Sequence, residues 1–198
     1  MIFRTTVLVL IFLLTACGEN PPVPVDHFYR LTLNPGTITS QPLTDQAIFV
    51  GKFLSDGIYN ERALLFSQDA DNRELQQYHY YFWSITPPSL LRDYLVDYLR
   101  AADSAPVIVS DFSSGDGLKI SGKILGFEKI KRAENDLVNV DLEIRLDKLG
   151  EPRPRLVKSY KAQETVNGGS MDDTVAAFNR AVDRVFADFV ADAAQAVR

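Results

Sequence analysis

Histidine is the side chain that most often acts as a general acid or base near neutral pH, and this chain has two, His27 and His79. His27 ends a proline-rich stretch, and His79 lies within a run of tyrosines. A single histidine among the aromatic residues of a strand is more typical of a packed or surface residue than of a general base. No serine stands in a Gly-x-Ser-x-Gly pattern, and no Ser/His/Asp set is suggested. We therefore expect no catalytic residues.

Ligands for metals or phosphate groups are equally scarce. Asp69 and Asp71 have the spacing that begins a calcium loop, but the third ligand, the turn glycine and the closing glutamate are missing, so a hairpin turn explains them better. The glycines at 115–117 and 168–169 are turn signals, because neither group stands in a phosphate-binding pattern between a strand and a helix. Two distant histidines and one cysteine make a zinc site improbable. The sequence predicts neither a metal nor a cofactor.

Cys17 is the only cysteine, and it follows Leu-Thr-Ala at the end of the apolar run Val7–Leu14. That run is shorter than the ~20 residues that cross a bilayer as a helix, so residues 1–16 are predicted to be a signal peptide. Leu-Thr-Ala-Cys resembles the lipobox of bacterial lipoproteins. The resemblance implies cleavage before Cys17, a diacylglycerol on its sulfur and an acyl chain such as palmitate on its amino group. Gly18, in place of aspartate, implies by the same resemblance the periplasmic side of the outer membrane. The alternative is an ordinary secretory signal with a chance cysteine.

Three segments are expected: the signal peptide (1–16), a lipidated cysteine with a Pro-rich linker (17–27), and one domain (28–198). Cleavage removes one basic residue, Arg4, and leaves 26 acidic and 20 basic residues, a formal charge of −6. This acidic balance argues against nucleic acid as a partner, and against anionic headgroups as a docking surface.

Hydrophobic periodicity predicts an α/β domain with helices packed on a mixed sheet. Thr86, Pro87 and Pro88 suit the start of a helix, and Ser170 with Asp173 suits a capping box. Alternation after Leu118 changes phase near Gly126, which predicts a bulge. The expected strands are 28–33, 47–54, 62–67, 74–82, 118–124, 138–146 and 155–166, and the expected helices begin near 86 and 170.

The unusual segment is Tyr78–Trp83, which places aromatic residues on both faces of a strand. One interpretation is a sheet covered on both sides. The other is an exposed aromatic patch for a protein or lipid partner, since tyrosine and tryptophan are enriched at interfaces.

This segment and the Pro-Pro-x-x-Leu start of the next helix resemble the ABC-type transport auxiliary lipoproteins (PqiC-like, MCE-associated). The strand 118–128 and the helix 175–182 are similar to that family too. The matching residues, which the resemblance implies as partner-binding, are Tyr80, Tyr81, Trp83, Pro87, Pro88, Leu90 and Leu91.

The resemblance implies a fold similar to the amino-terminal domain of TolB. It also implies a non-catalytic role in lipid transport between membranes, which supports membrane integrity, and a periplasmic MCE-domain protein of an ABC transporter as partner. The number of subunits stays open, a homo-oligomer included. The alternatives are a structural or assembly lipoprotein without a transport role and, ranked last, a periplasmic hydrolase that uses His79.

Overall fold

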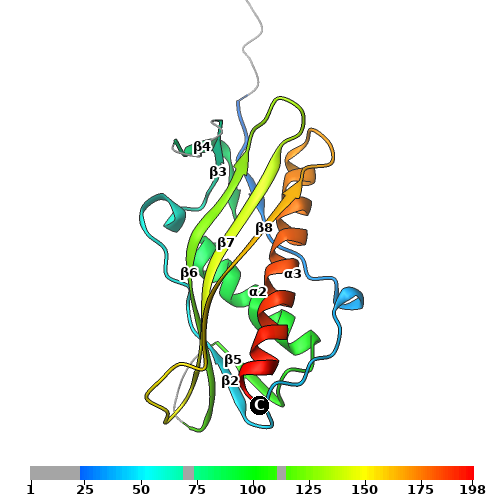
Figure 1. The fold of residues 1–198 in the computed structure, drawn as a ribbon. Coiled ribbons are helices and arrows are strands. Elements are labelled where there is room, and N and C mark those ends of the chain that lie inside the picture. Colours follow the sequence, from blue (N-terminus) through cyan, green and yellow to red (C-terminus); the bar gives the residue numbers. More distant parts are fainter. Residues whose placement is uncertain (1–22, 69–73, 111–114) are drawn as a thin grey trace, which may run out of the picture.

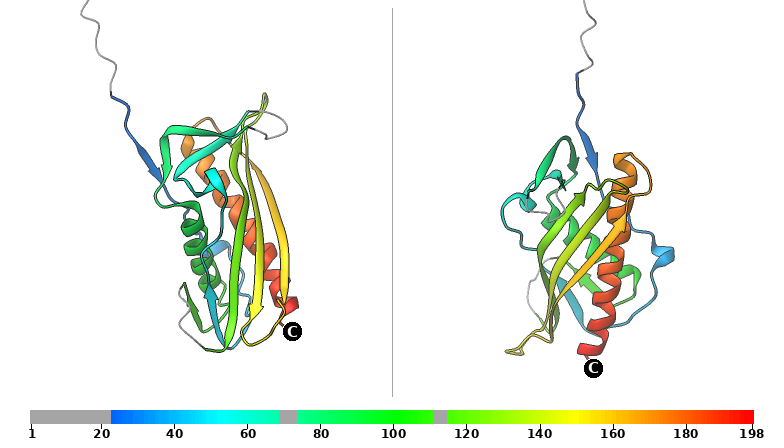
Figure 2. Two further views of the ribbon diagram at one scale, coloured as in Figure 1. Left: turned by 90° about the vertical axis from the view of Figure 1, so that its left-hand side faces the viewer. Right: turned by 45° about the horizontal axis from the view of Figure 1, so that its top comes forward.

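The computed structural model describes residues 23–68, 74–110 and 115–198, so Cys17, Asp69 and Asp71 lie outside the described residues. Two helices lie on one face of a long sheet, and the other face of β6, β7 and β8 is open (Figures 1 and 2). The elements are β1 (His27–Tyr29), η1 (Pro35–Thr37), β2 (Ala47–Val50), η2 (Gly57–Asn60), β3 (Ala63–Ser67), β4 (Gln76–Trp83), α2 (Pro87–Ala101), β5 (Val107–Val109), β6 (Gly117–Ile130), β7 (Leu137–Lys148), β8 (Leu156–Thr165) and α3 (Met171–Ala196).

The described strands form one eight-stranded sheet that branches at β6. One edge of β6 pairs with β7 along its length, and β8 adds antiparallel to β7. The other edge pairs in parallel with β2 at its start and with β3 at its end. The remaining pairs in the order β1-β4-β3-β6-β2-β5 are parallel for β1–β4 and β2–β5 and antiparallel for β3–β4. The predicted mixed sheet with packed helices is confirmed.

Three strands differ from the prediction. β1 ends at Tyr29 instead of residue 33, because the chain leaves the sheet and the Thr32 N–H donates to the Asn179 side chain of α3 (3.1 Å). β2 ends at Val50, after which Phe53 turns inward and its ring fills the space where Gly122 has no Cβ. β5 was not predicted, since three residues are too few to show an alternation.

Predictions at the bulge and at the two helix starts can be compared with the structure directly. The register of β6 against β7 shifts between Ile124 and Gly126, where the change of phase predicted a bulge. Helix α2 starts with two prolines after Thr86, although the Thr86 side chain makes no capping bond. The capping box of α3 is formed: Ser170 accepts from the Asp173 N–H, and Asp173 accepts from the Ser170 N–H.

The core lies between the sheet and the two helices, and its members run from Leu31 to Ala194. Phe186 of α3 is fully buried and its ring contacts those of Phe53, Tyr94 and Tyr98. The Tyr94 hydroxyl donates to Asp183 (2.7 Å), which joins α2 to α3. The apolar stripe predicted for the terminal helix is therefore core.

Glu128 is a buried carboxylate (2% exposed) near the end of β6. It accepts hydrogen bonds from the Tyr59 hydroxyl (2.9 Å) and the Asn139 amide (2.7 Å), and the Asn139 oxygen accepts from Gln163 (3.2 Å). Gly126 makes room for this network, because a Cβ there would overlap the Asn139 amide. The network fastens the segment between β2 and β3, through η2, to the sheet.

Phe186→Asp should destabilise the domain by several kcal/mol, because it would bury an unpaired charge among aromatic rings. Thermal or urea unfolding measures the effect. Ala191→Asp, at an exposed position of the same helix, is the matched control and should change stability by well under 1 kcal/mol. Equal stability of the two variants would show that this face of α3 is not core.

Burial raises the pKa of the Glu128 carboxyl above its ordinary value of 4.5, and outweighs the hydrogen bonds from Tyr59 and Asn139, which lower it. Between the unfolded-state pKa and the raised folded-state pKa, the folded protein binds more protons than the unfolded chain. This group's contribution to stability therefore falls as pH rises above about 4.5.

We expect Glu128→Gln to remove this pH dependence of stability. Free energies of unfolding measured from pH 4 to 8 should diverge between variant and wild type. Glu143→Gln, on the exposed face of β7, should run parallel to wild type; parallel curves for Glu128→Gln would contradict the assignment.

Candidate interaction surface

One end of the domain gathers the features that could bind a partner; we call it the linker end. The chain enters there through residues 23–26 and β1, beside the β6–β7 hairpin and the β3–β4 arm (Figure 1). The C-terminus and the β7–β8 turn lie at the opposite end. The candidate side chains come from β1, β4 and the two hairpins.

β4 carries the aromatic run and is strongly irregular there. Ala63 of β3 pairs with Phe82, and Leu65 pairs with Gln77, so the four residues Tyr78–Tyr81 stand opposite Leu64 alone. Such a bulge bends a strand and redirects its side chains. The simple alternation expected of this segment is therefore replaced by a bend, which exposes Tyr80 (44%) and leaves Tyr81 half-buried.

Five of the seven residues predicted to bind a partner are in the core. Trp83 is 1% exposed, and its ring packs on those of Phe127 (5.3 Å between centroids) and Phe178 (5.2 Å). The other four are buried in the first turns of α2: Pro87, Pro88, Leu90 and Leu91. These five side chains are therefore buried in the domain, whereas Tyr80 and Tyr81 reach its surface. Partner binding by the seven residues stays a prediction.

The parallel pairing of β1 with β4 adds neighbours that sequence reasoning missed. Phe28 is 56% exposed, and its ring stacks on Phe82 (5.7 Å) and lies under the Arg62 guanidinium (5.1 Å). Phe28, Phe82 and Arg62 are in contact, and Tyr80 and Tyr81 precede Phe82 along β4; we call these five residues the aromatic surface. No local signal marks Phe28 or Arg62, because only the strand register brings them to the tyrosines.

Each of the two histidines lies against a different tyrosine of β4. His27 stacks on Tyr81 (5.4 Å), and His79 lies beside Tyr80 (6.3 Å). Within 23–68, 74–110 and 115–198, no group of three His, Cys, Asp or Glu residues could hold a metal ion. In the same residues, no helix has both the length and the hydropathy needed to cross a membrane.

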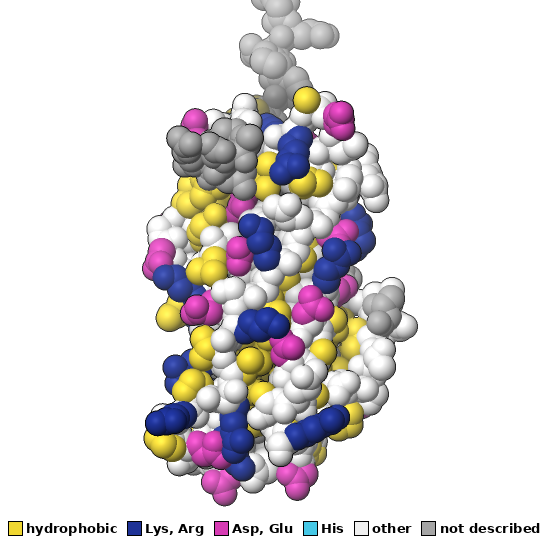
Figure 3. Space-filling view, in the orientation of Figure 1, with side chains coloured by type: hydrophobic (Ala, Val, Ile, Leu, Met, Phe, Trp, Pro, Cys, Tyr) yellow, Lys and Arg dark blue, Asp and Glu magenta, His cyan; other side chains and the backbone are white. Residues whose placement is uncertain are grey.

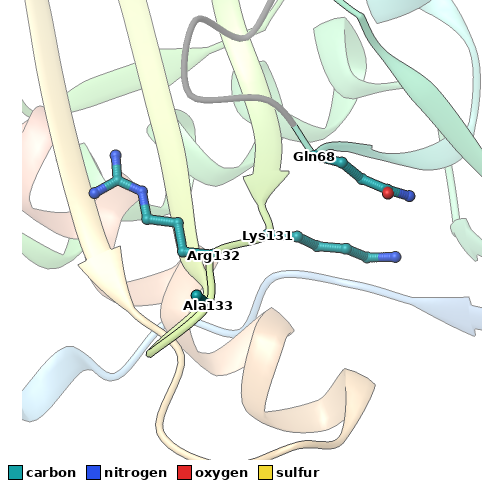
Figure 4. Close-up of a pocket in the computed structure, with 4 residues that line it drawn as sticks. All are labelled: Gln68, Lys131, Arg132 and Ala133. Carbon is teal, nitrogen blue, oxygen red and sulfur yellow. The ribbon is translucent and has the colours of Figure 1, made fainter.

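A second feature of the linker end is an open hollow of about 630 Å³ lined by Gln68, Lys131, Arg132 and Ala133. The Gln68 and Lys131 side chains extend in the same direction, and Arg132 points to the other side of the hairpin (Figure 4). The Lys131 ammonium lies 3.8 Å from the centre of the Phe66 ring. The main-chain N–H of Lys131 donates to the main-chain carbonyl of Ser67 (2.8 Å). The described lining of the hollow is thus cationic and polar, and the buried Phe66 ring supports one of its cations.

The β6–β7 hairpin that carries these cations is held by Asp136. Its carboxylate pairs with the buried Lys129 ammonium (2.8 Å) and accepts from the Arg132 N–H (3.1 Å). Burial alone would raise the pKa of Asp136, but Lys129 and the Arg132 N–H hold it below its ordinary value. Burial, with Asp136 next, raises the pKa of Tyr78 to about 12, so this phenol stays protonated at neutral pH. The arrangement can bind anions and apolar groups.

Solved structures resemble this chain over most of its length. A protein from Xanthomonas campestris assigned to the DUF330 family has a TM-score of 0.75 at 17% identity, with 86% of this chain and 95% of that one covered. An uncharacterized protein has a TM-score of 0.66 at 14% identity, covering 88% and 99%. A hypothetical protein from Chlamydia trachomatis has 0.53 at 9%, covering 78% and 98%. At these identities the likeness shows the fold alone. No curated protein sequence matches the chain.

The family model of the ABC-type transport auxiliary lipoprotein component matches residues 59–190, which is two thirds of the chain. The match runs from η2 into α3 and contains the β6–β8 sheet, most of the core and both hairpins of the linker end. This chain therefore belongs to the ABC-type transport auxiliary lipoprotein family.

Proposed function

We propose that this protein is a periplasm-facing, outer-membrane lipoprotein that serves as a non-catalytic auxiliary component of an MCE/ABC-type lipid transport system. The observation that carries the proposal is the family match over residues 59–190. Two features support it: the lipobox-like Leu-Thr-Ala-Cys17, and a linker end that offers contact surfaces in place of a reactive set. The family is an auxiliary component of ABC transport; the MCE partner, the lipid cargo and the outer membrane are the proposed part.

The linker limits how far the domain can lie from the membrane that holds Cys17. From Cys17 to His27 the chain has ten residues, which span at most about 35 Å when fully extended. Three prolines, Pro21, Pro22 and Pro24, favour an extended chain in this linker. A domain held on such a linker stays close to its membrane, and a transporter component that reaches across the periplasm must come to it.

The aromatic surface is the proposed contact for the MCE-domain partner. Exposed Phe28 and Tyr80 offer large apolar area, and the Arg62 guanidinium adds a charge on the Phe28 ring. Tyrosine and arginine are the residues that most often dominate binding energy at protein interfaces. Tyr81 supports the surface from below through its stack with His27.

Cys17→Ala should move the protein from the membrane fraction to the soluble periplasm, because it removes the site of lipidation. Fractionation followed by immunoblotting measures the change. Because stable membrane binding depends on the acyl chains and the variant carries none, the loss of membrane-bound protein should be nearly complete. Retention of the variant in the outer membrane at the wild-type level would contradict the anchor.

Tyr80→Ala should weaken capture of the MCE-domain protein by about tenfold, the equivalent of about 1.4 kcal/mol, while the thermal unfolding of the domain stays unchanged. Trp83→Ala should instead cost about 3–5 kcal/mol of stability, because Trp83 is core. Val157→Ala, exposed on β8, is the control for binding. Recovery of only outer-membrane barrels or pilus components with the wild-type protein would favour the assembly role and contradict the transport role.

A further inference from the structure

The β6–β7 hairpin and the linker lie at the same end of a long molecule (Figures 1 and 2). β6 has 14 residues and spans about 45 Å, so the β7–β8 turn lies about that far from the β6–β7 hairpin. The linker reaches at most about 35 Å. A membrane that holds Cys17 is therefore within easy reach of the β6–β7 hairpin and much farther from the opposite turn.

The hairpin presents two cations, Lys131 and Arg132, for which no salt bridge is seen within residues 23–68, 74–110 and 115–198. The Asp136 carboxylate forms its salt bridge with Lys129 and accepts from the Arg132 main-chain N–H, and the Lys131 charge acts on it only at longer range. Glu134 is exposed in the same hairpin and is its one other carboxylate. At the opposite turn, by contrast, Glu151 pairs with both Arg155 and Lys148.

The Lys131 ammonium is positioned before any ligand arrives. The Phe66 ring lies under the Lys131 ammonium, and the main chain of Lys131 is hydrogen-bonded to β3. Gln68 extends parallel to Lys131 and brings an amide to the same side (Figure 4). Arg132 projects on the other side, so the hairpin carries a cation on each flank. An ammonium, a guanidinium and an amide are all donors to phosphate oxygens.

We propose that the β6–β7 hairpin is a second membrane contact, in which Lys131 and Arg132 bind the phosphates of phospholipid headgroups in the bilayer that holds Cys17. This inference rests on the proposed lipid anchor. The net acidic charge of the chain does not oppose it, because charges more than about 10 Å from a phosphate are largely screened at cellular ionic strength. The anchor keeps the hairpin at the surface, and the two cations set the angle of the domain.

The mature lipoprotein tests the proposal after reconstitution into vesicles of phosphatidylethanolamine and phosphatidylglycerol. Since the Cys17 sulfur carries the lipid, an introduced cysteine is the only free thiol and can take a fluorophore. One variant is Ala133→Cys in the β6–β7 hairpin, and the matched variant is Arg153→Cys in the β7–β8 turn; both positions are exposed. Lipids with a nitroxide on the headgroup should quench the label at position 133 severalfold more than the label at position 153.

Charge reversal then separates the hairpin from the anchor. Lys131→Glu with Arg132→Glu should lower the quenching at position 133 to the level at position 153, while Lys119→Glu with Arg153→Glu, at the other end, should leave it unchanged. Far-ultraviolet circular dichroism and thermal unfolding check that each variant is folded. Equal quenching at the two labelled positions, or no effect of the first pair, would overturn the inference. Protein that fails to float with the vesicles would refute the anchor of the proposed function, and this inference with it.

Discussion

The rest of the structure depends on how the edge of β6 that faces away from β7 is shared between two strands. β2 occupies the start of this edge and β3 its end, and the bulge near Leu125 lies between the two. Before the bulge, Ile120 and Ile124 face the helices. After the bulge, Phe127 faces the helices and packs on Trp83 and Phe178. A straight β6 would direct Phe127 to the opposite face. The bulge thus lets β6 pair with β2, which itself pairs with β5, at its start and with β3 of the β3–β4 arm at its end.

The segment between β2 and β3, which contains η2, has to be held beside that edge of β6. Leu54 forms a single bridge to Lys123, and Tyr59 of η2 donates to Glu128. A buried carboxylate is costly unless it is hydrogen-bonded, and Glu128 receives bonds from two side chains on different elements. The network therefore penalises any displacement of η2. Since β3 follows η2 directly, the position of the β3–β4 arm, and of the aromatic surface on it, is fixed by the same bonds.

Local patterns predicted the parts of the fold that local chemistry determines. Alternation identified β6, β7 and β8, the phase change identified the bulge, and the Ser170–Asp173 box identified the start of α3. The candidate surface was harder, because strand pairing across distant segments creates it. Phe28 meets Phe82, and Lys131 meets Phe66, only through tertiary pairing. The burial of Trp83 is likewise a tertiary property that its local sequence does not show.

The junction between linker and domain decides whether these surfaces have a defined direction. β1 pairs with only three residues of β4, so its strand bonds alone would be a weak hold. The next residues strengthen it: Ser84 donates to the Tyr29 carbonyl (2.7 Å), Leu31 is buried in the core, and Thr32 is bonded to Asn179 of α3. The chain is thereby fixed to both layers within six residues of its first strand bond. Rotation of the domain about the linker is then limited to residues before β1, and the hairpin and the aromatic surface keep constant positions relative to the point from which the domain is held.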